Sequence, residues 1–233
     1  MQAIVICSIG NPGLDVLLAS IKCYAPDLPL YISHINPHKY RHSVNAVLFP
    51  NLQSNFGDAY NAAIDVAFRD GFDSVIIAND DVVLTPTTIA LMKEDSKLLS
   101  SRGFKTGFLG ARSDYVLQDQ NIRFPVDNDD FVGLKRRSED QVKLTEVIAP
   151  IFASISREAW DTAKFPSTNW YSDNIICHDL QKAGFQHFVS RAYVHHVGSQ
   201  TVGTDFQKCH EEPREWIKAN RPDMYEEIYG KTP

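Results

Sequence analysis

The most informative stretch of this sequence is an apolar segment that leads directly into acidic residues, Ser74-Val75-Ile76-Ile77-Ala78-Asn79-Asp80-Asp81-Val82. Its β-branched residues predict a buried strand over Ser74–Ala78, which delivers two carboxylates at its carboxyl end. One interpretation is structural, because strand ends often use Asp and Asn to cap turns. The other is a divalent-cation site that also holds phosphates, because hard cations prefer oxygen ligands.

Strand-like and helix-like segments alternate on the N-terminal side of this motif. Residues 10–13, Gly-Asn-Pro-Gly, form a dense turn signal, and Gly71 predicts a helix C-cap. We expect strands over 3–9, 30–35 and 44–49 and helices over 14–24 and 58–70. This alternation predicts an α/β fold with a largely parallel sheet covered by helices. Ligands then bind at the carboxyl ends of the strands, in the loops after Ile9, Ile35 and Ala78.

The second half of the chain is less regular. Thr85 as N-cap and Pro86 at the first helical position predict a helix that ends at Ser101. The polar stretch from Gln118 to Glu146 predicts a mobile loop or hairpin that closes over a ligand. We also expect strands over 106–111 and 188–196, an apolar segment over 147–156, and helices over 173–184 and 213–219.

Composition limits the classes of function. The chain has 233 residues, with 23 Lys and Arg against 29 Asp and Glu, so its net charge is −6. This acidic balance argues against a nucleic-acid partner, because duplex DNA is bound by a basic face. No apolar run reaches the roughly 20 residues that cross a bilayer, and the N-terminal apolar segment lacks the basic residues that precede it in a signal peptide. We therefore expect a cytoplasmic protein without a transmembrane segment.

The cysteines do not form a pattern. Cys7, Cys23, Cys177 and Cys209 are scattered, without the spacing of a disulfide framework, so we expect reduced thiols. A zinc site built from the adjacent pairs Cys177-His178, His195-His196 and Cys209-His210 is disfavoured. Neighbouring residues on a strand point to opposite faces and do not share one ion.

Three further segments follow in a defined order. Residues 55–61, Asn-Phe-Gly-Asp-Ala-Tyr-Asn, precede a predicted helix, and residues 170–173, Trp-Tyr-Ser-Asp, begin another. Residues 195–201, His-His-Val-Gly-Ser-Gln-Thr, follow the last strand. Together with the Asp pair, these segments resemble the family 2 glycosyltransferases of the GT-A fold, over roughly residues 3–100 and 147–201. The resemblance implies a Rossmann-like nucleotide-diphospho-sugar transferase domain, with a mixed, mostly parallel sheet flanked by helices.

The resemblance also implies roles for individual residues. Asp81 and His196 would hold Mn²⁺ or Mg²⁺, and Asp173 would be the catalytic base. The residues implied in donor and nucleotide binding are Ile9, Asn11, Asn36, Asn55, Gly57, Asn61, Asn79 and Asp80. Asn36 and Asn79 stand where the family often has Asp, and Ser172 stands where it more often has an acidic residue. The departure at Asn36 leaves the choice of nucleotide open.

Physical chemistry agrees with these roles. A bound cation compensates the charge that develops on a departing diphosphate, and a carboxylate activates an acceptor hydroxyl by removing its proton. The expected partners are a nucleotide sugar and a carbohydrate or glycosylated acceptor. A UDP-sugar is favoured because UDP is the most frequent carrier for this fold. Inversion at the anomeric carbon is implied by family membership alone.

Several residues keep a second interpretation. Asp173 suits the N-cap of its helix as well as a base, and His195 and His196 suit simple hydrogen bonding on a strand. Aromatic residues either anchor the core and loops or line a sugar site, namely Trp160, Trp170 and Tyr171. The run Lys135-Arg136-Arg137 predicts a solvated face, with contact to an anionic substrate as the alternative.

We expect one domain over residues 1–233. Its parts are a nucleotide-binding half over 1–101, an acceptor-side half over 102–201, and a tail with a short helix over 202–233. Two other functions stay open. A nucleotidyltransferase is disfavoured because residues 9–13 contain no Lys or Arg for a phosphate loop. A nucleotide- or carbohydrate-binding protein without catalysis is separable only by an assay.

Overall fold

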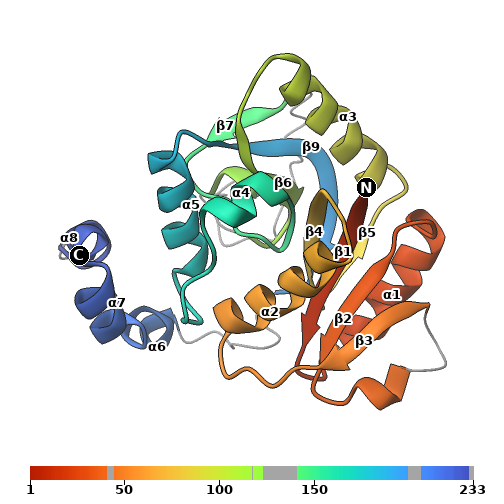
Figure 1. Ribbon diagram of the computed structural model, residues 1–233, viewed down its shortest axis with the longest axis horizontal. Helices are drawn as coiled ribbons and strands as arrows, with labels where there is room; N and C mark the ends of the chain where they lie inside the picture. The colour runs from red at the N-terminus through yellow and green to blue at the C-terminus, as the bar shows by residue number, and fades with distance from the viewer. Residues whose placement is uncertain (41–44, 117, 123–140, 199–205, 231–233) are drawn as a thin grey trace, which may run out of the picture.

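A computed structural model describes residues 1–40, 45–116, 118–122, 141–198 and 206–230. Within these residues nine strands form one mixed sheet (Figure 1). Its first half is parallel, in the order β3-β2-β1-β4. These strands are β1 Gln2–Ser8, β2 Leu30–His34, β3 Ala46–Pro50 and β4 Ser74–Asn79. The predicted βαββαβ order of the N-terminal half is therefore confirmed, with shifts of one or two residues at most boundaries.

The other strands extend the sheet beyond β4 in mixed directions. β8 lies antiparallel between β4 and β6, and β9 lies parallel to β6. Both β5 and β7 pair antiparallel with β9. The bounds are β5 Val82–Leu84, β6 Thr106–Ser113, β7 Lys143–Thr145, β8 Phe152–Ser156 and β9 Gln186–His196. The sheet thus joins both halves of the chain through the β4–β8 pair.

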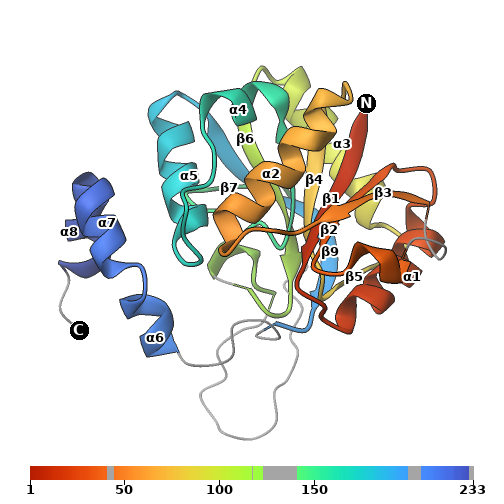
Figure 2. The same ribbon diagram turned by 60° about the horizontal axis from the view of Figure 1, so that its bottom comes forward.

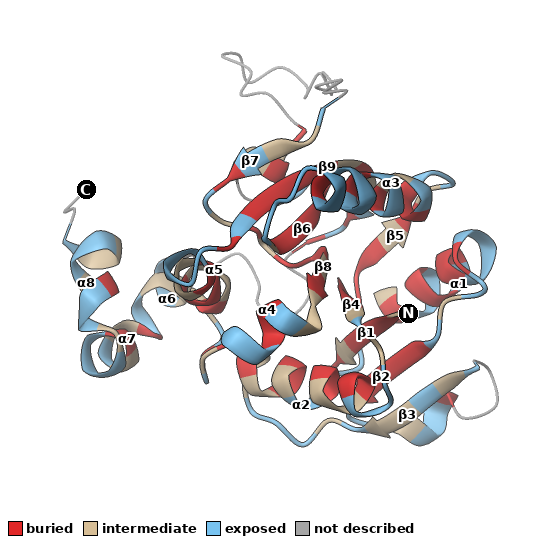
Figure 3. Cartoon of the chain, turned by 45° about the horizontal axis from the view of Figure 1, so that its top comes forward, coloured by how far each residue is buried: buried red, intermediate tan, exposed pale blue. Residues whose placement is uncertain are grey.

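Helices cover both faces of the sheet, so its central strands are apolar throughout. Within β1, Ile4 and Ile6 pack into one core cluster, whereas Ala3 and Val5 pack into the other. α1 Gly13–Tyr24 and α3 Thr88–Ser101 supply the first cluster. α2 Phe56–Arg69, α4 Arg157–Thr162 and α5 Ser172–Lys182 supply the second (Figure 2). Figure 3 shows the buried sheet between the half-buried helices.

Three short helices follow β9 and lie beside α5 (Figure 2). They are α6 Phe206–Glu211, α7 Arg214–Asn220 and α8 Pro222–Tyr229. Ile217 and Met224 form a small core with Ile175 of α5. The Arg221 guanidinium pairs with the Asp179 carboxylate of α5 at 2.8 Å. Among the described helices, none is both long and apolar enough to cross a membrane.

Two expectations from the sequence are wrong in detail. α3 begins at Thr88 and not at Pro86, because the Thr88 hydroxyl accepts a hydrogen bond from the Thr85 amide at 2.8 Å and donates one to the Tyr193 carbonyl at 2.7 Å. These bonds hold residues 85–87 in a turn. The stretch 118–146 also contains packed structure, because β7 pairs with β9.

The middle of that polar stretch lies outside the described residues. It includes residues 123–140 and with them the run Lys135-Arg136-Arg137. At its described ends, a 3₁₀ turn over Gln118–Gln120 precedes the gap and β7 follows it. Asp119 ties the two ends together, because its carboxylate accepts hydrogen bonds from the Thr145 hydroxyl at 2.8 Å and from the Lys143 ammonium.

Candidate functional site

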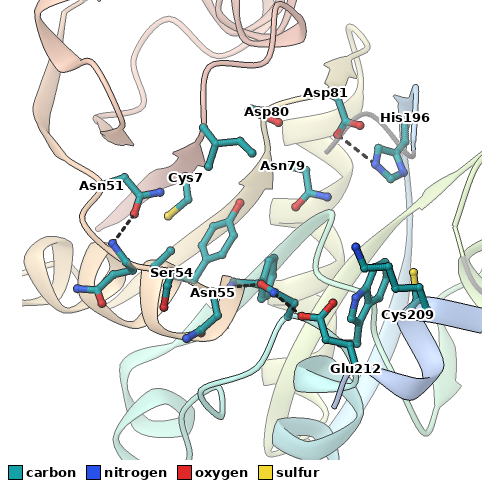
Figure 4. A pocket seen from close by; sticks show the side chains of 18 residues that line it. Cys7, Asn51, Ser54, Asn55, Asn79, Asp80, Asp81, His196, Cys209 and Glu212 are labelled. Atoms are coloured by element: carbon teal, nitrogen blue, oxygen red, sulfur yellow. Dashed lines mark hydrogen bonds and ion pairs between the residues drawn. The ribbon is translucent and has the colours of Figure 1, made fainter. Parts of the chain in front are cut away.

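The candidate site forms where the chain leaves β4 and turns back as β5. β5 pairs with the end of β9 in a register that places Val82 opposite His196. The Val197 amide donates to the Asp81 carbonyl at 3.1 Å, which extends the pairing past the strand. As a result, the Asp81 carboxylate lies 3.1 Å from the Nε2 atom of His196 (Figure 4). The strand register therefore brings together two residues that lie far apart in the sequence.

A cavity of about 490 Å³ opens beside this pair. Part of its wall comes from the loops after β1, β3 and β4, and part comes from the segment before α5 and from the C-terminal helices (Figure 4). The wall is formed by Cys7, Ile9, Asn51, Gln53, Ser54, Asn55, Phe56, Ala59, Tyr60, Asn79, Asp80, Asp81, Asn169, Trp170, His196, Lys208, Cys209 and Glu212. Of the three loops in which the sequence places a ligand, those after Ile9 and Ala78 contribute to this wall, whereas the loop after Ile35 does not.

Asp80 and Asp81 differ in their surroundings, although both are only 6% exposed. Burial raises the pKa of the Asp80 carboxyl to about 6; a hydrogen bond from Ser8 opposes this shift, and the neighbouring Asp81 charge adds to it. The Asn11 amide also donates to Asp80 at 3.4 Å. Asp81 faces the His196 imidazole instead. Asp81 is thus the carboxylate with a partner that suits a cation site.

His196 is oriented by its backbone neighbours. Its Nδ1–H donates to the Tyr115 carbonyl, which leaves Nε2 directed at Asp81. Burial lowers the pKa of the imidazole, but the Asp81 carboxylate, the Tyr115 carbonyl and the Asp114 carboxylate together more than offset that effect, so the pKa of His196 is raised overall. A histidine whose second ring nitrogen is held by a carbonyl is the usual arrangement of a metal-binding histidine.

The structure distinguishes the two adjacent histidines. The half-exposed His195 places its Nδ1 atom 2.6 Å from the Asp114 carboxylate, on the other side of β9 from Asp81. The second oxygen of Asp114 accepts the His196 backbone amide at 3.1 Å. His196 is therefore the histidine of the candidate site. Among the described residues, no group of three or more His, Cys, Asp and Glu side chains is placed to hold a metal ion.

Four of the eight predicted donor-binding residues are in the cavity wall. Ile9, Asn55, Asn79 and Asp80 are in its wall with Asp81 and His196, and Asn11 is adjacent through Asp80. Asn55 is also the N-cap of α2, because its side-chain oxygen accepts the Asp58 amide at 2.9 Å.

Three other predicted donor-binding residues lie outside the cavity wall. The Asn61 side chain binds both backbone groups of Phe165, at 2.8 and 3.1 Å. A Cβ atom on Gly57 would lie 1.8 Å from the Pro166 carbonyl oxygen, so Gly57 permits close packing of backbone on backbone. The backbone amide of Asn36 donates to Nδ1 of His34 at 2.8 Å. Asn61 and Gly57 therefore shape the site from behind its wall.

Asp173 lies in the first turn of α5 and is absent from the cavity wall, although Trp170 is part of it. Its carboxylate accepts the Asn174 amide at 3.0 Å, and burial raises the pKa of the carboxyl above its ordinary value. The alternative interpretation of Asp173 as the N-cap is wrong, because Tyr171 occupies that position.

The cavity contains residues that the sequence did not single out. Asn51, Gln53 and Ser54 follow β3, where the rule for parallel sheets directs attention to the loop. Lys208, Cys209 and Glu212 come from the C-terminal helices. No pattern in a charged tail signals that it returns to the site, so only the three-dimensional structure reveals this part of the wall.

Comparisons with known proteins identify the fold. No protein-family model matches the chain, and no curated protein matches it. Among solved structures, residues 1–349 of TarS from S. aureus align with a TM-score of 0.58 and 12% identity, over 97% of this chain and 68% of that one. The same segment in complex with UDP-GlcNAc gives 0.59 and 12% identity, over 97% and 71% of the two chains.

A longer TarS structure aligns with a TM-score of 0.56 and 12% identity, and this chain covers 42% of its length. TarS has a GT-A-like glycosyltransferase fold. The mixed, mostly parallel sheet flanked by helices is therefore a GT-A-like α/β fold, as expected from the sequence. At this identity the likeness shows the fold and does not single out family 2.

Proposed function

We propose that this protein is a glycosyltransferase that takes a sugar from a nucleoside-diphosphate donor, with a UDP-sugar favoured. The observation that carries the proposal is the Asp81–His196 pair at the end of β4, inside a cavity of about 490 Å³. A ligand pocket of this size accommodates a molecule of nucleotide-sugar dimensions. The GT-A-like fold supports the proposal, as does the UDP-GlcNAc bound to the neighbour TarS.

Mn²⁺ or Mg²⁺ fits the pair formed by Asp81 and His196. Adjacent ligands of an octahedral ion with bonds of about 2.1 Å lie about 3.0 Å apart, and the Asp81 and His196 atoms are separated by 3.1 Å. Two side chains leave most positions around the ion for oxygens of a diphosphate and for water. When bound, the cation supplies positive charge for the departing diphosphate. Asp81 and His196 would hold it, and the Tyr115 carbonyl would keep the imidazole ring in its orientation.

The amide-rich loop after β3 suits the nucleoside. Asn51 and Gln53 present side-chain amide groups, which both donate and accept hydrogen bonds, as recognition of a nucleobase requires. The Asn55 amide also lines the cavity, but its oxygen and nitrogen are bonded to Asp58. Ile9 supplies an apolar surface at the end of β1. We assign this part of the cavity to base and ribose, with Asn79 and Asp80 between it and the cation pair.

Asp173 is the proposed catalytic base. A carboxylate with a raised pKa is a better proton acceptor than an ordinary one at neutral pH, and burial has this effect on Asp173. Proton removal from an acceptor hydroxyl and attack on the face opposite the diphosphate would invert the anomeric carbon. The acceptor is proposed to be a carbohydrate or a glycosylated molecule that enters beside Trp170.

Calorimetric titration with UDP, with and without Mn²⁺, tests the proposal. Wild type should bind UDP more tightly with Mn²⁺, and Asp81→Asn should remove most of that gain. Asp73→Asn is a matched control, because this exposed carboxylate pairs with the amino terminus far from the cavity. Saturation at a hundredfold excess over Kd should stabilise the fold by about 2.7 kcal/mol. Equal UDP binding by Asp81→Asn and wild type would contradict the cation site.

Product analysis separates the alternatives. A glycosyltransferase releases UDP from UDP-GlcNAc or another UDP-sugar, whereas a nucleotidyltransferase releases pyrophosphate from UTP. A protein that binds UDP but releases neither product is a binding protein. Asp81→Asn and Asp73→Asn should be assayed in parallel, so that UDP release is traced to the proposed site.

A further inference from the structure

Tyr171 has an unusual backbone conformation at an informative place. It is the only residue other than glycine with a positive φ among those described, with φ 60° and ψ 8°. The left-handed region is costly for a side chain of this size and persists only when neighbouring structure enforces it. Tyr171 lies directly after Trp170 of the cavity wall and two residues before Asp173. The strained residue therefore joins two parts of the proposed site.

The C-terminal helices hold the Tyr171 side chain in place. Its hydroxyl lies 2.6 Å from Nδ1 of His210 in α6, and its ring packs against those of His210 and Tyr229 with centroids 6.0 and 6.2 Å apart. The Tyr229 hydroxyl donates to the His210 carbonyl at 2.8 Å, which fixes the histidine in turn. Two of the three C-terminal helices thus contact one side chain at the start of α5.

A second connection holds the same segment through Asn169, which bonds both to α2 and to the residue after α6. The Asn169 side-chain oxygen accepts the Phe56 amide at 2.9 Å, and its amide group donates to the Glu212 carboxylate at 2.9 Å. Asn169, Phe56 and Glu212 all line the cavity. The Ile175 amide of α5 donates to the Tyr171 carbonyl at 3.0 Å. The backbone position of Tyr171 therefore fixes the first turn of the helix.

We propose that Tyr171 is a positioning residue, and that its bond to His210 locks the turn that sets Trp170 in the cavity wall and Asp173 at the start of α5. We call the bond between Tyr171 and His210 the lock. The role of Asp173 as a base rests on the proposed function, whereas the existence of the lock does not. Because misplacement of a reacting group by about 1 Å costs up to a hundredfold in rate, loss of the lock should act on turnover more than on donor binding.

Hydrogen exchange tests the lock without any activity assay. Tyr171→Phe removes the hydroxyl, and His210→Phe removes its partner while keeping an aromatic ring. Each variant should exchange the amides of residues 172–176 at least about tenfold faster than wild type, with a similar melting temperature. The double variant should be no worse than either single variant, because both changes remove the same bond. Tyr225→Phe is the matched control, since Tyr225 contacts Tyr229 and belongs to the same cluster.

Kinetics with UDP-GlcNAc test the consequence. Release of UDP at saturating donor should fall by about tenfold to a hundredfold in Tyr171→Phe and His210→Phe, with KM for the donor unchanged. Unchanged exchange at residues 172–176 in both variants would overturn the lock. Faster exchange with unchanged turnover, or a KM that rises as turnover falls, would overturn its role in positioning Asp173. If wild type neither binds UDP nor cleaves any UDP-sugar, the proposed function fails, and the exchange result alone still decides whether the bond between Tyr171 and His210 holds the turn.

Discussion

At the scale of single residues, the candidate site depends on the contact between Asp81 and His196. The Asp81 carboxylate alone would be one acid at a strand end, and the His196 imidazole alone would be a hydrogen-bonded strand residue. Their separation of 3.1 Å turns them into a site with a fixed geometry. Asp114 and Tyr115 define that geometry further, because they hold the backbone and the ring of His196.

Asp173→Asn separates catalysis from binding. The amide keeps the size of the side chain but does not accept a proton, so turnover of donor and acceptor should fall by about 10²–10⁴-fold. Donor affinity should stay within a small factor, because the proposed donor contacts lie elsewhere in the cavity. Steady-state rates and calorimetry measure the two quantities. Asp73→Asn, at an exposed carboxylate that pairs with the amino terminus, should leave both unchanged. Weaker donor binding with normal turnover would contradict the assignment of Asp173 as the catalytic base.

His187 makes stability depend on pH. It is fully buried, its Nδ1 atom accepts the Phe108 amide at 3.0 Å, and its Nε2–H donates to the Cys177 carbonyl at 3.0 Å. Only the neutral ring fits these partners, and burial lowers the pKa of His187 below its ordinary 6.5. The unfolded chain therefore binds a proton more readily, and this contribution to stability is present above pH 6.5 and is lost as the pH falls below it.

Urea unfolding between pH 5 and 7.5 measures this effect. The free energy of unfolding of wild type minus that of His187→Gln should decrease as the pH falls below 6.5, by at most about 1.4 kcal/mol per pH unit. Glutamine can accept and donate at the same two partners but does not titrate. A difference that stays constant across the pH range would show that His187 contributes nothing to the pH dependence.

At the scale of elements, close packing between segments shapes the cavity. The start of α2 carries Asn55 and rests on the segment that follows Phe165. Gly57 permits this contact, since its amide donates to the Thr168 carbonyl at 3.2 Å and its missing side chain leaves room for Pro166. The nucleoside side of the cavity and the Trp170 side therefore meet at one glycine.

Gly57→Ala should both destabilise the protein and weaken UDP binding. The added methyl group overlaps backbone that does not move freely, so we expect a loss of about 1–3 kcal/mol or more, and displacement of Asn55. Gly71→Ala is the control for destabilisation alone. It strains a residue with φ +95° where nothing lies within 4 Å of the added atom. Chemical denaturation and calorimetry report the two effects. If Gly57→Ala is destabilised but binds UDP with normal affinity, the packing of α2 does not shape the UDP site.

Sequence patterns predict the elements that carry a strong local signal. The parallel strands β1 to β4, the helices α1 and α2, and α5 with β9 follow from apolar runs and helical spacing. β5 is different, because three residues have no periodicity and become a strand only by pairing with β9. That pairing creates the Asp81–His196 geometry. The family resemblance therefore identifies Asp81 and His196 from the sequence, but their contact becomes visible only in the structure.

At the scale of the whole molecule, the cavity depends on the docking of the C-terminal helices. Their own core is small and contains the fully buried Ile217, with Met224 and Ile175 as its buried partners. Segments with few buried contacts open at low free-energy cost. Because Lys208, Cys209 and Glu212 complete the wall, opening of this segment would expose one side of the site.

Ile217→Ala should loosen this segment without unfolding the rest. Truncation of a buried isoleucine costs about 2–5 kcal/mol, which is a large share of the stability of so small a core. Amides of residues 206–230 should exchange faster, those of β4 should not, and UDP-GlcNAc should bind more weakly. Val16→Ala, at a valine of α1 that is 54% exposed, is the control. Equal loss of protection in β4 and in the helices would show that the two parts unfold as one unit.

The cavity wall that begins at Cys7 and ends at Glu212 has a consequence for biosynthesis. A ribosome delivers β1 first, and the N-terminal strands emerge from the exit tunnel while α6 is still to be translated. During that interval the nascent chain presents Asp81 without His196, and Asn51 without the opposite wall. The cavity wall, and with it the proposed donor site, is complete only after nearly the whole described chain has been released. A chain that terminates before α6 would therefore lack the part of the cavity wall that Lys208, Cys209 and Glu212 form.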